Sequence, residues 1–321
     1  MRAIQITQPG GPEVLTISEI ERPSAGPEQA VVDISLAGVN FIDVYHRIGR
    51  YPKPLPFVPG AEGVGVISEL CPDAPSDLRV GDRVGWVMST GGYGEAVALT
   101  ATTLIPLPDD ISDEDALALL LQGMTTHYLA HDSYSIQPGD VAVVHSAAGG
   151  VGLLLTRYIK SLGGRVVATA STPEKRALAI AAGADVAVPY EGFRDQVLEV
   201  SQGAGAHVVY DGVGADTFDE SIASLRRRGT MVLYGAASGP VPAFEPTKLA
   251  AGSIFFTRPS LGDFVATRLE LIWRANEVFA AFRRGDMQVA IGGRYPLSQA
   301  SQAHIDLEGR KTTGKLVLQV R

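Results

Sequence analysis

The sequence is poor in cysteine and in positive charge, and it has no long hydrophobic run. Cys71 is the only cysteine among 321 residues, which excludes an intramolecular disulfide and a multi-cysteine zinc site. The formal net charge of -8 disfavours a general electrostatic attraction to nucleic acid or anionic lipid. No apolar run approaches the roughly 18 residues that cross a bilayer, and the N-terminus lacks the apolar core of a signal peptide. These absences predict a cytoplasmic protein without nucleic-acid or membrane partners.

What the sequence does contain is typical of a globular protein of about two domains. Hydrophobic residues make up 45% and charged residues 19% of the chain. Up to about residue 120, short apolar or alternating segments such as "RAIQIT", "QAVVDISLAGV" and "GVGVISEL" are separated by Gly and Pro. This pattern predicts a β-rich first domain.

The pattern then changes to alternating strands and helices. The segment "ISDEDALALLLQGMTTHYLAH" predicts a helix capped by Ser112, and "ADTFDESIASLRRRG" predicts one that ends at Gly229. Such alternation favours a doubly wound parallel sheet with helices on both faces, an α/β fold. After about residue 260 a helical segment precedes a terminal strand, "GKLVLQV", which we expect to return to the first domain. The predicted domains are residues 1–121 with 262–321, and residues 122–261.

A glycine-rich turn separates the predicted strand "VAVVHS" from the helix "VGLLLTRYIKSLG". Its spacing is Ala147-x-Gly149-x-x-Gly152, a G-x-G-x-x-G pattern with Ala in first place. Glycines at such a turn let the backbone approach a pyrophosphate, and the following helix N-terminus supplies N–H groups. The strand-turn-helix context predicts dinucleotide binding.

The second strand of this unit does not end in an acidic residue. An NAD site usually has Asp or Glu there to bind the ribose 2′-hydroxyl. The segment "VVATASTPEK" has no acid before Glu174 and instead offers the hydroxyls of Ser171 and Thr172 and the cation of Lys175. Hydroxyls and an ammonium suit a 2′-phosphate. The sequence therefore favours NADP(H) over NAD(H).

At this point several motifs together resemble a known family. The segments "AGVNFIDVYHRIGRYPKPLPFVPGAEGVGVI", "VGDRVGW", "GGYGEAV", "QGMTTHYL", "HSAAGGVG", "YDGVGADTF" and "TRPSL" occur in order over the whole chain. In these segments the chain resembles the zinc-free quinone oxidoreductases, the zeta-crystallin-like branch of the medium-chain dehydrogenase/reductase superfamily. The family often has Gln where this chain has Arg157, and we expect little effect from that difference.

The resemblance implies a discontinuous GroES-like catalytic domain, a Rossmann domain, NADPH as cofactor and a homodimer. It also implies reduction of quinones or related conjugated carbonyls. By matching position, Asn40, Tyr45 and Tyr51 are the candidate catalytic residues at the nicotinamide end. The candidates for cofactor binding are Asn40, Thr125, Gly149, Gly150, Val151, Ser171, Lys175, Tyr190, Tyr234, Ser238, Arg258 and Lys315.

The zinc-dependent relatives provide a contrast at three positions. Where the resemblance places their zinc ligands, this chain has Asn40, Ala61 and Gln122. Asn, Ala and Gln cannot form a tight zinc site. An alcohol dehydrogenase reaction, which needs a Lewis acid, is therefore disfavoured.

Two functions from different classes remain open. The first is an NADPH-dependent quinone reductase, with an enone or alkenal double-bond reductase as the variant on the same scaffold. In either, Asn40 could donate to the oxygen that gains charge, and the two tyrosines could shape an apolar slot or pass a proton. The second is a cofactor-binding structural or RNA-binding protein, since the resemblance permits such a role. The acidic composition favours the enzyme.

Overall fold

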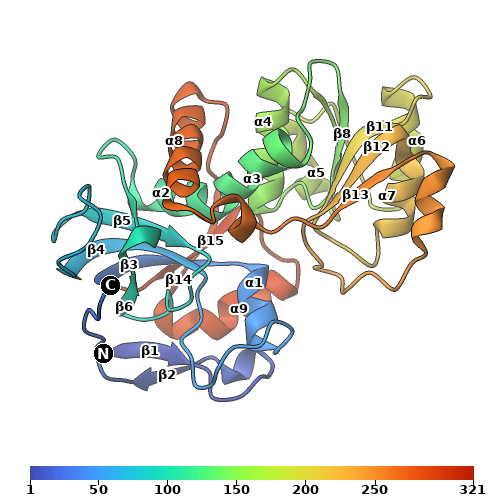
Figure 1. The fold of residues 1–321 in the computed structure, drawn as a ribbon. Helices are drawn as coiled ribbons and strands as arrows, with labels where there is room; N and C mark the ends of the chain where they lie inside the picture. Colours follow the sequence, from blue (N-terminus) through green and yellow to red (C-terminus); the bar gives the residue numbers. More distant parts are fainter. The chain divides into compact units, whose positions relative to one another are not determined.

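The computed structural model describes residues 1–321 and divides them into two compact units. The first unit contains Met1–Leu121, Val265–Asn276 and Val289–Arg321, and the second contains Gln122–Phe264 and Glu277–Gln288. Figure 1 shows the elements of both units. No helix of the protein combines the length and the hydrophobicity that spanning a bilayer requires.

The first unit is built on a seven-stranded sheet with the order β14-β15-β3-β4-β5-β7, to which β6 is added by pairing with β3. A separate antiparallel pair joins β1 to β2. The strands are β1 Arg2–Gln5, β2 Thr16–Glu19, β3 Gln29–Val39, β4 Glu62–Leu70, β5 Arg83–Val87, β6 Ala96–Thr100, β7 Ile105–Pro106, β14 Ile291–Pro296 and β15 Lys315–Gln319. The helices are α1 Phe41–Arg47, α2 Asp113–Ala118 and α9 Ala300–Glu308, with the first half of α8 Arg268–Arg284.

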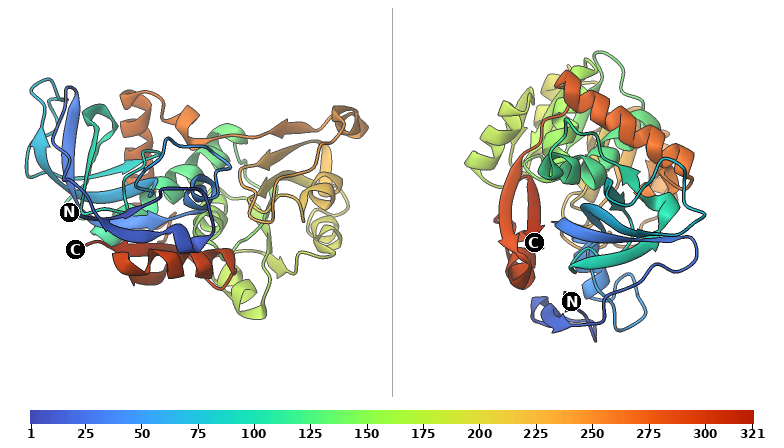
Figure 2. Two further views of the ribbon diagram at one scale, coloured as in Figure 1. Left: turned by 90° about the horizontal axis from the view of Figure 1, so that it is seen from below. Right: turned by 90° about the vertical axis from the view of Figure 1, so that its left-hand side faces the viewer.

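The terminal strand returns to the sheet of the N-terminal half, as the sequence predicts. β15 pairs antiparallel with β3, with Leu316 opposite Val39. The two ends of the chain consequently meet, since Arg2 and Arg321 both bind Glu95. Figure 2 shows both termini close together on this unit.

The second unit is a six-stranded parallel sheet with the order β10-β9-β8-β11-β12-β13. Its strands are β8 Val141–Val144, β9 Arg165–Thr169, β10 Val186–Val188, β11 Ala206–Asp211, β12 Leu225–Leu233 and β13 Phe255–Thr257. Its helices are α3 Met124–Tyr128, α4 Gly150–Ser161, α5 Pro173–Ala181, α6 Phe193–Val200 and α7 Phe218–Ser224. In Figure 1, α4 and α5 lie on one side of the strands and α6 and α7 on the other. The predicted doubly wound fold is confirmed.

The strand order places the glycine-rich turn at a functional position. Counted along the chain from β8, the order is 3-2-1-4-5-6, so neighbouring connections leave the sheet in opposite directions between β8 and β11. Open α/β sheets bind ligands at this switch point, beyond the carboxyl ends of the strands. The turn from β8 to α4 lies there.

Several predicted elements need correction. The helix predicted to end at Gly229 ends at Ser224, and Leu225 begins β12 instead. Parallel pairing with β11 extends this segment, so tertiary contacts override the helix propensity of the three arginines that follow. The helix predicted after Ser112 is interrupted by π-helical turns at Leu119–Gly123 and Leu129–Ser133. The sequence also missed three short elements, β13, β14 and α9.

Candidate active site

The glycine-rich turn closes tightly against its own backbone. A Cβ at Gly152 would overlap the Ser146 carbonyl oxygen and the Ala147 backbone. Ser146 itself has a positive φ of 52°, an uncommon conformation for a residue with a side chain. Glycine at position 152 is therefore required by the turn itself, before any ligand is considered.

The N-terminus of α4 lacks a capping side chain. Gly149 is the N-cap residue and no side-chain hydrogen bond caps the helix. The first N–H groups of a helix have no intrahelical partner, so those of Gly150 and Val151 are available to an anion. A Cβ at Gly150 would overlap the Gln122 side chain, so the approach to these groups also depends on glycine. An uncapped helix start with this clearance fits a dinucleotide pyrophosphate.

The turn after β9 contains hydroxyls and two basic residues. Thr172 caps α5 by accepting from the Lys175 N–H at 3.3 Å, while Ser171 is exposed. Arg176, which the sequence analysis did not single out, donates from Nη1 to the Ala170 carbonyl at 3.3 Å. Its side chain therefore lies at the end of β9 as a second cation. The position of Arg176 on a helical face gave no sign of this in the sequence.

Glu174 is the acid nearest this turn, and it lies in the first turn of α5. Its own backbone N–H and the Thr172 hydroxyl hold the pKa of this exposed carboxyl below its usual range. It is therefore ionised at neutral pH. A 2′-phosphate at this turn would be attracted by two cations and repelled by one carboxylate.

The remaining candidates in the second unit have different surroundings. Ser238 donates to the Val213 carbonyl at 2.9 Å and accepts from the Asp216 N–H at 3.1 Å, so its hydroxyl stabilises a turn. Burial, followed by the charge of Asp211, raises the pKa of Tyr234. Thr125 is buried in α3. The ring centroid of Tyr190 lies 6.2 Å from that of His145. Arg258 donates to the Pro259 carbonyl.

A buried polar network supports the carboxyl ends of three strands. His145 follows β8, and its Nδ1 lies 2.8 Å from Thr169 Oγ1 and its Nε2 2.9 Å from Ser221 Oγ. Ser221 donates onward to Asp211 at 3.3 Å, which leaves its oxygen to accept from His145. Burial lowers the pKa of His145, so the ring is neutral and joins β8, β9 and β11 next to the glycine-rich turn.

In the first unit, Asn40 is held by a buried ion pair. Its Nδ2 donates to Glu62 Oε1 at 2.7 Å, and its Oδ1 accepts from Lys315 Nζ at 3.3 Å. Lys315 also pairs directly with Glu62, and the two side chains are 1% and 0% exposed. A Cβ at Gly38 would overlap both charged groups. The ion pair fixes the orientation of the amide and leaves one Nδ2 hydrogen for another acceptor.

Lys315 was predicted at the cofactor or active-site rim, and the structure places its ammonium group on Asn40 and Glu62. The Leu121 N–H adds a third donor to Glu62 at 3.2 Å. The sequence analysis did not identify this link between Glu62 and Asn40. Asn40 and Lys315 are 275 positions apart, so no local signal in the sequence indicates this arrangement.

A second buried network begins at the backbone of Asn40. The Asn40 N–H donates to Asp43 Oδ2 at 2.9 Å, and Tyr93 donates to the same oxygen at 3.4 Å. Tyr93 Oη lies 3.1 Å from His304 Nε2, and Arg47 Nη1 lies 3.0 Å from His304 Nδ1. Burial raises the pKa of Asp43 to about 7, against the two backbone N–H groups that bind it.

Arg47 connects this second network to Glu308, which is partly exposed. It is 1% exposed, and its guanidinium makes two hydrogen bonds to Glu308, at 2.7 and 3.0 Å. An arginine keeps all of its protons, so it cannot pass one from Glu308 to His304. The network therefore fixes positions around Asn40 and α1 and does not conduct protons.

The candidate tyrosines pack against each other at the C-terminal end of α1. Tyr45 and Tyr51 meet edge to face, with ring centroids 5.6 Å apart. The Arg50 guanidinium lies over the Tyr45 ring at 4.7 Å. Tyr45 is buried and Tyr51 is 41% exposed. Of the two rings, Tyr51 is therefore the one open to a ligand from solvent.

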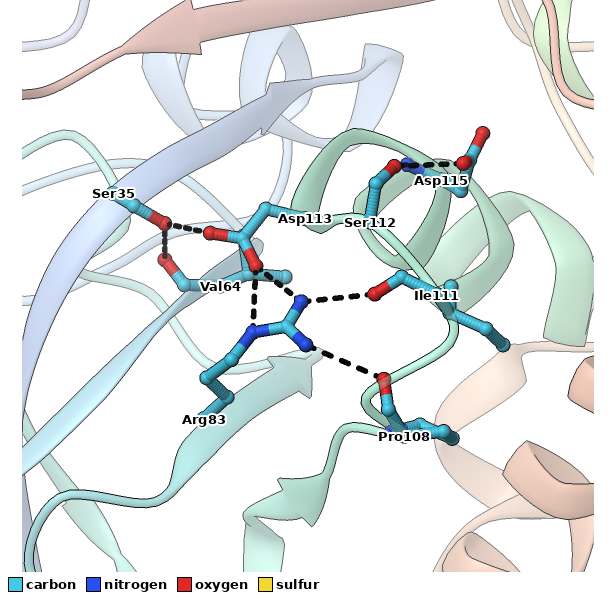
Figure 3. Close-up of polar contacts among 8 residues, drawn as sticks. All are labelled: Ser35, Val64, Arg83, Pro108, Ile111, Ser112, Asp113 and Asp115. Atoms are coloured by element: carbon cyan, nitrogen blue, oxygen red, sulfur yellow. Dashed lines mark hydrogen bonds and ion pairs between the residues drawn. The ribbon is translucent and has the colours of Figure 1, made fainter.

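A third cluster fixes the start of α2. Figure 3 shows the guanidinium of Arg83 between Asp113 and the carbonyls of Pro108 and Ile111, with Ser35 on the other carboxylate oxygen of Asp113. Ser112 Oγ accepts from the Asp115 N–H at 3.1 Å, which confirms the predicted cap. The cluster anchors the chain shortly before Leu121, whose N–H binds Glu62.

The chain has no group of three or more His, Cys, Asp or Glu side chains arranged to hold a metal ion. Asn40, at one of the ligand positions of the zinc-dependent relatives, instead binds Glu62 and Lys315. Ala61 contributes its backbone N–H to Asp43 at 2.8 Å. The local geometry of these residues is thus built from hydrogen bonds and an ion pair.

Comparison with known proteins gives matches over the whole chain. Residues 26–109 match the alcohol dehydrogenase GroES-like domain and residues 150–273 match the family model described as zinc-binding dehydrogenase. The quinone oxidoreductase of Pseudomonas aeruginosa is 39% identical, with 99% of each chain covered. A 2-haloacrylate reductase from Burkholderia is 36% identical, with 98% of each covered.

Solved structures agree with these matches. A mycobacterial protein solved in complex with NADPH has a TM-score of 0.97 and 45% identity, with 100% of each chain covered. The quinone oxidoreductase of Escherichia coli, also solved with NADPH, has a TM-score of 0.96 and 36% identity over 100% of each chain. The predicted combination of a Rossmann domain and a GroES-like domain is therefore confirmed. The chain belongs to the quinone oxidoreductase family of the medium-chain dehydrogenase/reductase superfamily.

Proposed function

We propose that the protein is an NADPH-dependent quinone oxidoreductase that works without zinc. The observation that carries this proposal is the full-length similarity to quinone oxidoreductases, including relatives solved with NADPH. The uncapped N-terminus of α4, at the switch point of the parallel sheet, supports it independently. The substrate is a small quinone or a related conjugated carbonyl.

The cofactor is proposed to be held by residues of the second unit. The N–H groups of Gly150 and Val151 would receive the pyrophosphate, and Gly149, whose own N–H binds the Ser146 carbonyl, would let it approach the turn. Ser171 and Lys175 would hold the 2′-phosphate, with Tyr190 beside the adenosine. The other proposed contacts in this unit are Thr125, Tyr234, Ser238 and Arg258.

The bound cofactor supplies a hydride, and a quinone that accepts it with one proton becomes a hydroquinone. During the transfer, negative charge develops on a quinone oxygen. The free Nδ2 hydrogen of Asn40 is proposed to stabilise this charge. Lys315 and Glu62 hold the amide in place beforehand, so little reorganisation is needed. Tyr45 and Tyr51 are proposed to shape the slot for the ring, and the proton can come from water.

A second candidate is reduction of a conjugated carbon–carbon double bond. The similarity to a 2-haloacrylate reductase favours it, because the same hydride donor serves both reactions. Fold similarity does not distinguish these acceptors, since substrate choice depends on the loops around the site.

The test is consumption of NADPH by purified protein with a panel of quinones and simple enones, with NADH in parallel. We expect rapid oxidation of NADPH with quinones, slower reaction with NADH, and full activity after exhaustive chelation. Activity that is lost on chelation and restored by zinc would contradict the zinc-free mechanism. NADPH binding without turnover of any acceptor would favour a structural or RNA-binding role.

We also propose a cytoplasmic homodimer, with residues 1–121 and 262–321 as the catalytic domain and 122–261 as the NADP(H)-binding domain. The single cysteine, Cys71, is free, which suits a reducing compartment. Light scattering would give the mass in solution, and a monomer mass would refute the dimer. Limited proteolysis would test the domain limits, with cleavage expected near residues 121 and 261.

A further inference from the structure

Two basic residues lie beside the exposed candidate tyrosine without a carboxylate partner. Arg50 and Lys53 flank Tyr51 in the sequence, and neither makes a salt bridge in this structure. By contrast, nearby Arg47 is fully paired with Glu308. Uncompensated cations beside a ligand site are notable in a chain whose net charge is -8.

The position of Arg50 is set by the backbone of α1 and the turn after it. The Gly49 N–H binds the His46 carbonyl at 3.1 Å, and the Tyr51 N–H binds the Tyr45 carbonyl at 3.2 Å. Gly49 has a φ of 75°, which turns the chain back over the helix. Arg50 is thereby placed with its guanidinium over the Tyr45 ring.

The contact with the Tyr45 ring holds the Arg50 guanidinium where a ligand can reach it. A guanidinium that lies over an aromatic face keeps its in-plane N–H donors available at its edge. These donors match the paired oxygens of a carboxylate or sulfonate. The exposed ring of Tyr51 packs against the same Tyr45 ring, so an aromatic surface and an anion-binding group lie side by side.

Lys53 adds to the positive potential, and His46 does not. Burial, assisted by the charge of Lys53, lowers the pKa of His46 to about 4. The ring of His46 lies 6.4 Å from that of Tyr51. Because His46 is neutral at physiological pH, it adds no positive charge there. The charge beside Tyr51 comes from Arg50 and Lys53.

From this arrangement we infer that the protein prefers conjugated acceptors that bear a negative charge, bound with the anion at Arg50 and the ring against Tyr51. This inference rests on the proposed reductase function and specifies its substrate class as aromatic or conjugated acceptors with a carboxylate or sulfonate substituent. Neutral quinones of the same shape are poorer substrates because they lack a group for the guanidinium.

The test compares naphthoquinone with naphthoquinone sulfonate in the wild type, Arg50→Gln and Lys53→Gln. Arg79→Gln is the matched control, since Arg79 is an exposed arginine of the same unit without a salt bridge. The readout is the ratio of kcat/KM for the sulfonate to kcat/KM for the neutral quinone. The ratio corrects for the different reduction potentials of the two acceptors when variants are compared.

We expect Arg50→Gln to lower this ratio about fivefold at low ionic strength, and much less at about 0.5 M salt, because screening weakens the attraction. Lys53→Gln should lower it less, and Arg79→Gln should leave it unchanged. A ratio that is equal in the wild type and Arg50→Gln would overturn the inference. A matching loss of NADPH affinity would also overturn it, by assigning Arg50 to the cofactor.

A binding measurement separates this inference from the proposed function. Calorimetric titration of naphthoquinone sulfonate into the NADP⁺-loaded protein needs no turnover. Binding that weakens about fivefold in Arg50→Gln supports the anion site even if no acceptor is reduced, in which case only the reductase function fails. Equal binding to the wild type and Arg50→Gln would refute the anion site, whatever the activity.

Discussion

Replacement of His304 by Gln should change how the stability of the protein depends on pH. His304 is fully buried, and burial together with the charge of Arg47 lowers its pKa to about 3. The hydrogen bonds of His304 also require a neutral imidazole ring. Arg47 can only donate to Nδ1, so Nδ1 carries no proton and Nε2–H donates to Tyr93.

The magnitude follows from proton linkage. In the unfolded chain a histidine has a pKa of about 6.5. Below that pH the unfolded chain therefore binds a proton that the folded protein does not bind. The contribution of neutral His304 to stability is complete above about pH 6.5 and is lost as the pH falls toward about 3. Each pH unit below about 6.5 lowers the free energy of unfolding by about 1.4 kcal/mol, so the loss at about pH 5 is about 2 kcal/mol.

Glutamine preserves the hydrogen bonds without the titration. Its carbonyl can accept from Arg47 and its amide can donate to Tyr93. The free energy of unfolding of His304→Gln minus that of the wild type should therefore be about 2 kcal/mol higher at about pH 5 than at about pH 8. An absolute loss from imperfect packing would be the same at both pH values and would not affect this difference.

Urea unfolding at the two pH values, followed by the fluorescence of buried Trp86, measures this difference. Tyr93→Phe is the control, because it removes a hydroxyl from the network and keeps the buried imidazole. Its stability should depend on pH as that of the wild type does. Parallel pH dependences for His304→Gln and the wild type would refute the assignment of a neutral His304.

Three further variants test the ion pair beside Asn40 and the proposed cofactor-binding turns. Lys315→Met should destabilise the fold by about 3 kcal/mol, because it leaves the Glu62 carboxylate buried without its cation; Glu62→Gln in the same chain should restore part of the loss in urea unfolding, and no restoration would contradict the pairing. Gly150→Val should abolish binding of NADPH and NADH in fluorescence titrations, and unchanged binding would remove this turn from the cofactor site. Lys175→Ala should raise the Kd for NADPH about tenfold and that for NADH little; equal small effects would separate Lys175 from the 2′-phosphate.

The parts of the fold predicted correctly have local signals in the sequence. The turn around Gly149 lies within one strand-turn-helix segment, so its spacing and context identify it. The Ser112 cap is recognised from the acids that follow it. The terminal strand was placed by elimination, because the alternating segment offered it no partner. The assignment of residues to the cofactor remains a prediction from family resemblance.

The parts that were missed depend on contacts between distant residues. His304 and Arg47 are 257 positions apart, and α9, which contains His304, was not predicted. Nothing in the sequence near Glu62 indicates that Lys315 will neutralise it. At Arg226, Arg227 and Arg228, three good helix formers enter β12, since strand pairing outweighs intrinsic propensity.

The place of β15 in the first sheet has a consequence for synthesis on the ribosome. β15 lies between β14 and β3, and its first residue, Lys315, follows every strand of the second unit along the chain. The parallel sheet of the second unit is complete in sequence at Thr257, so it can form while the ribosome is still adding residues. The first sheet cannot be completed until β15 has been synthesised, and until then the end of β3 that pairs with β15 has no partner. Lys315, the partner of Asn40, is translated 275 positions after Asn40, and a chain that stops before Lys315 lacks the cation that neutralises Glu62.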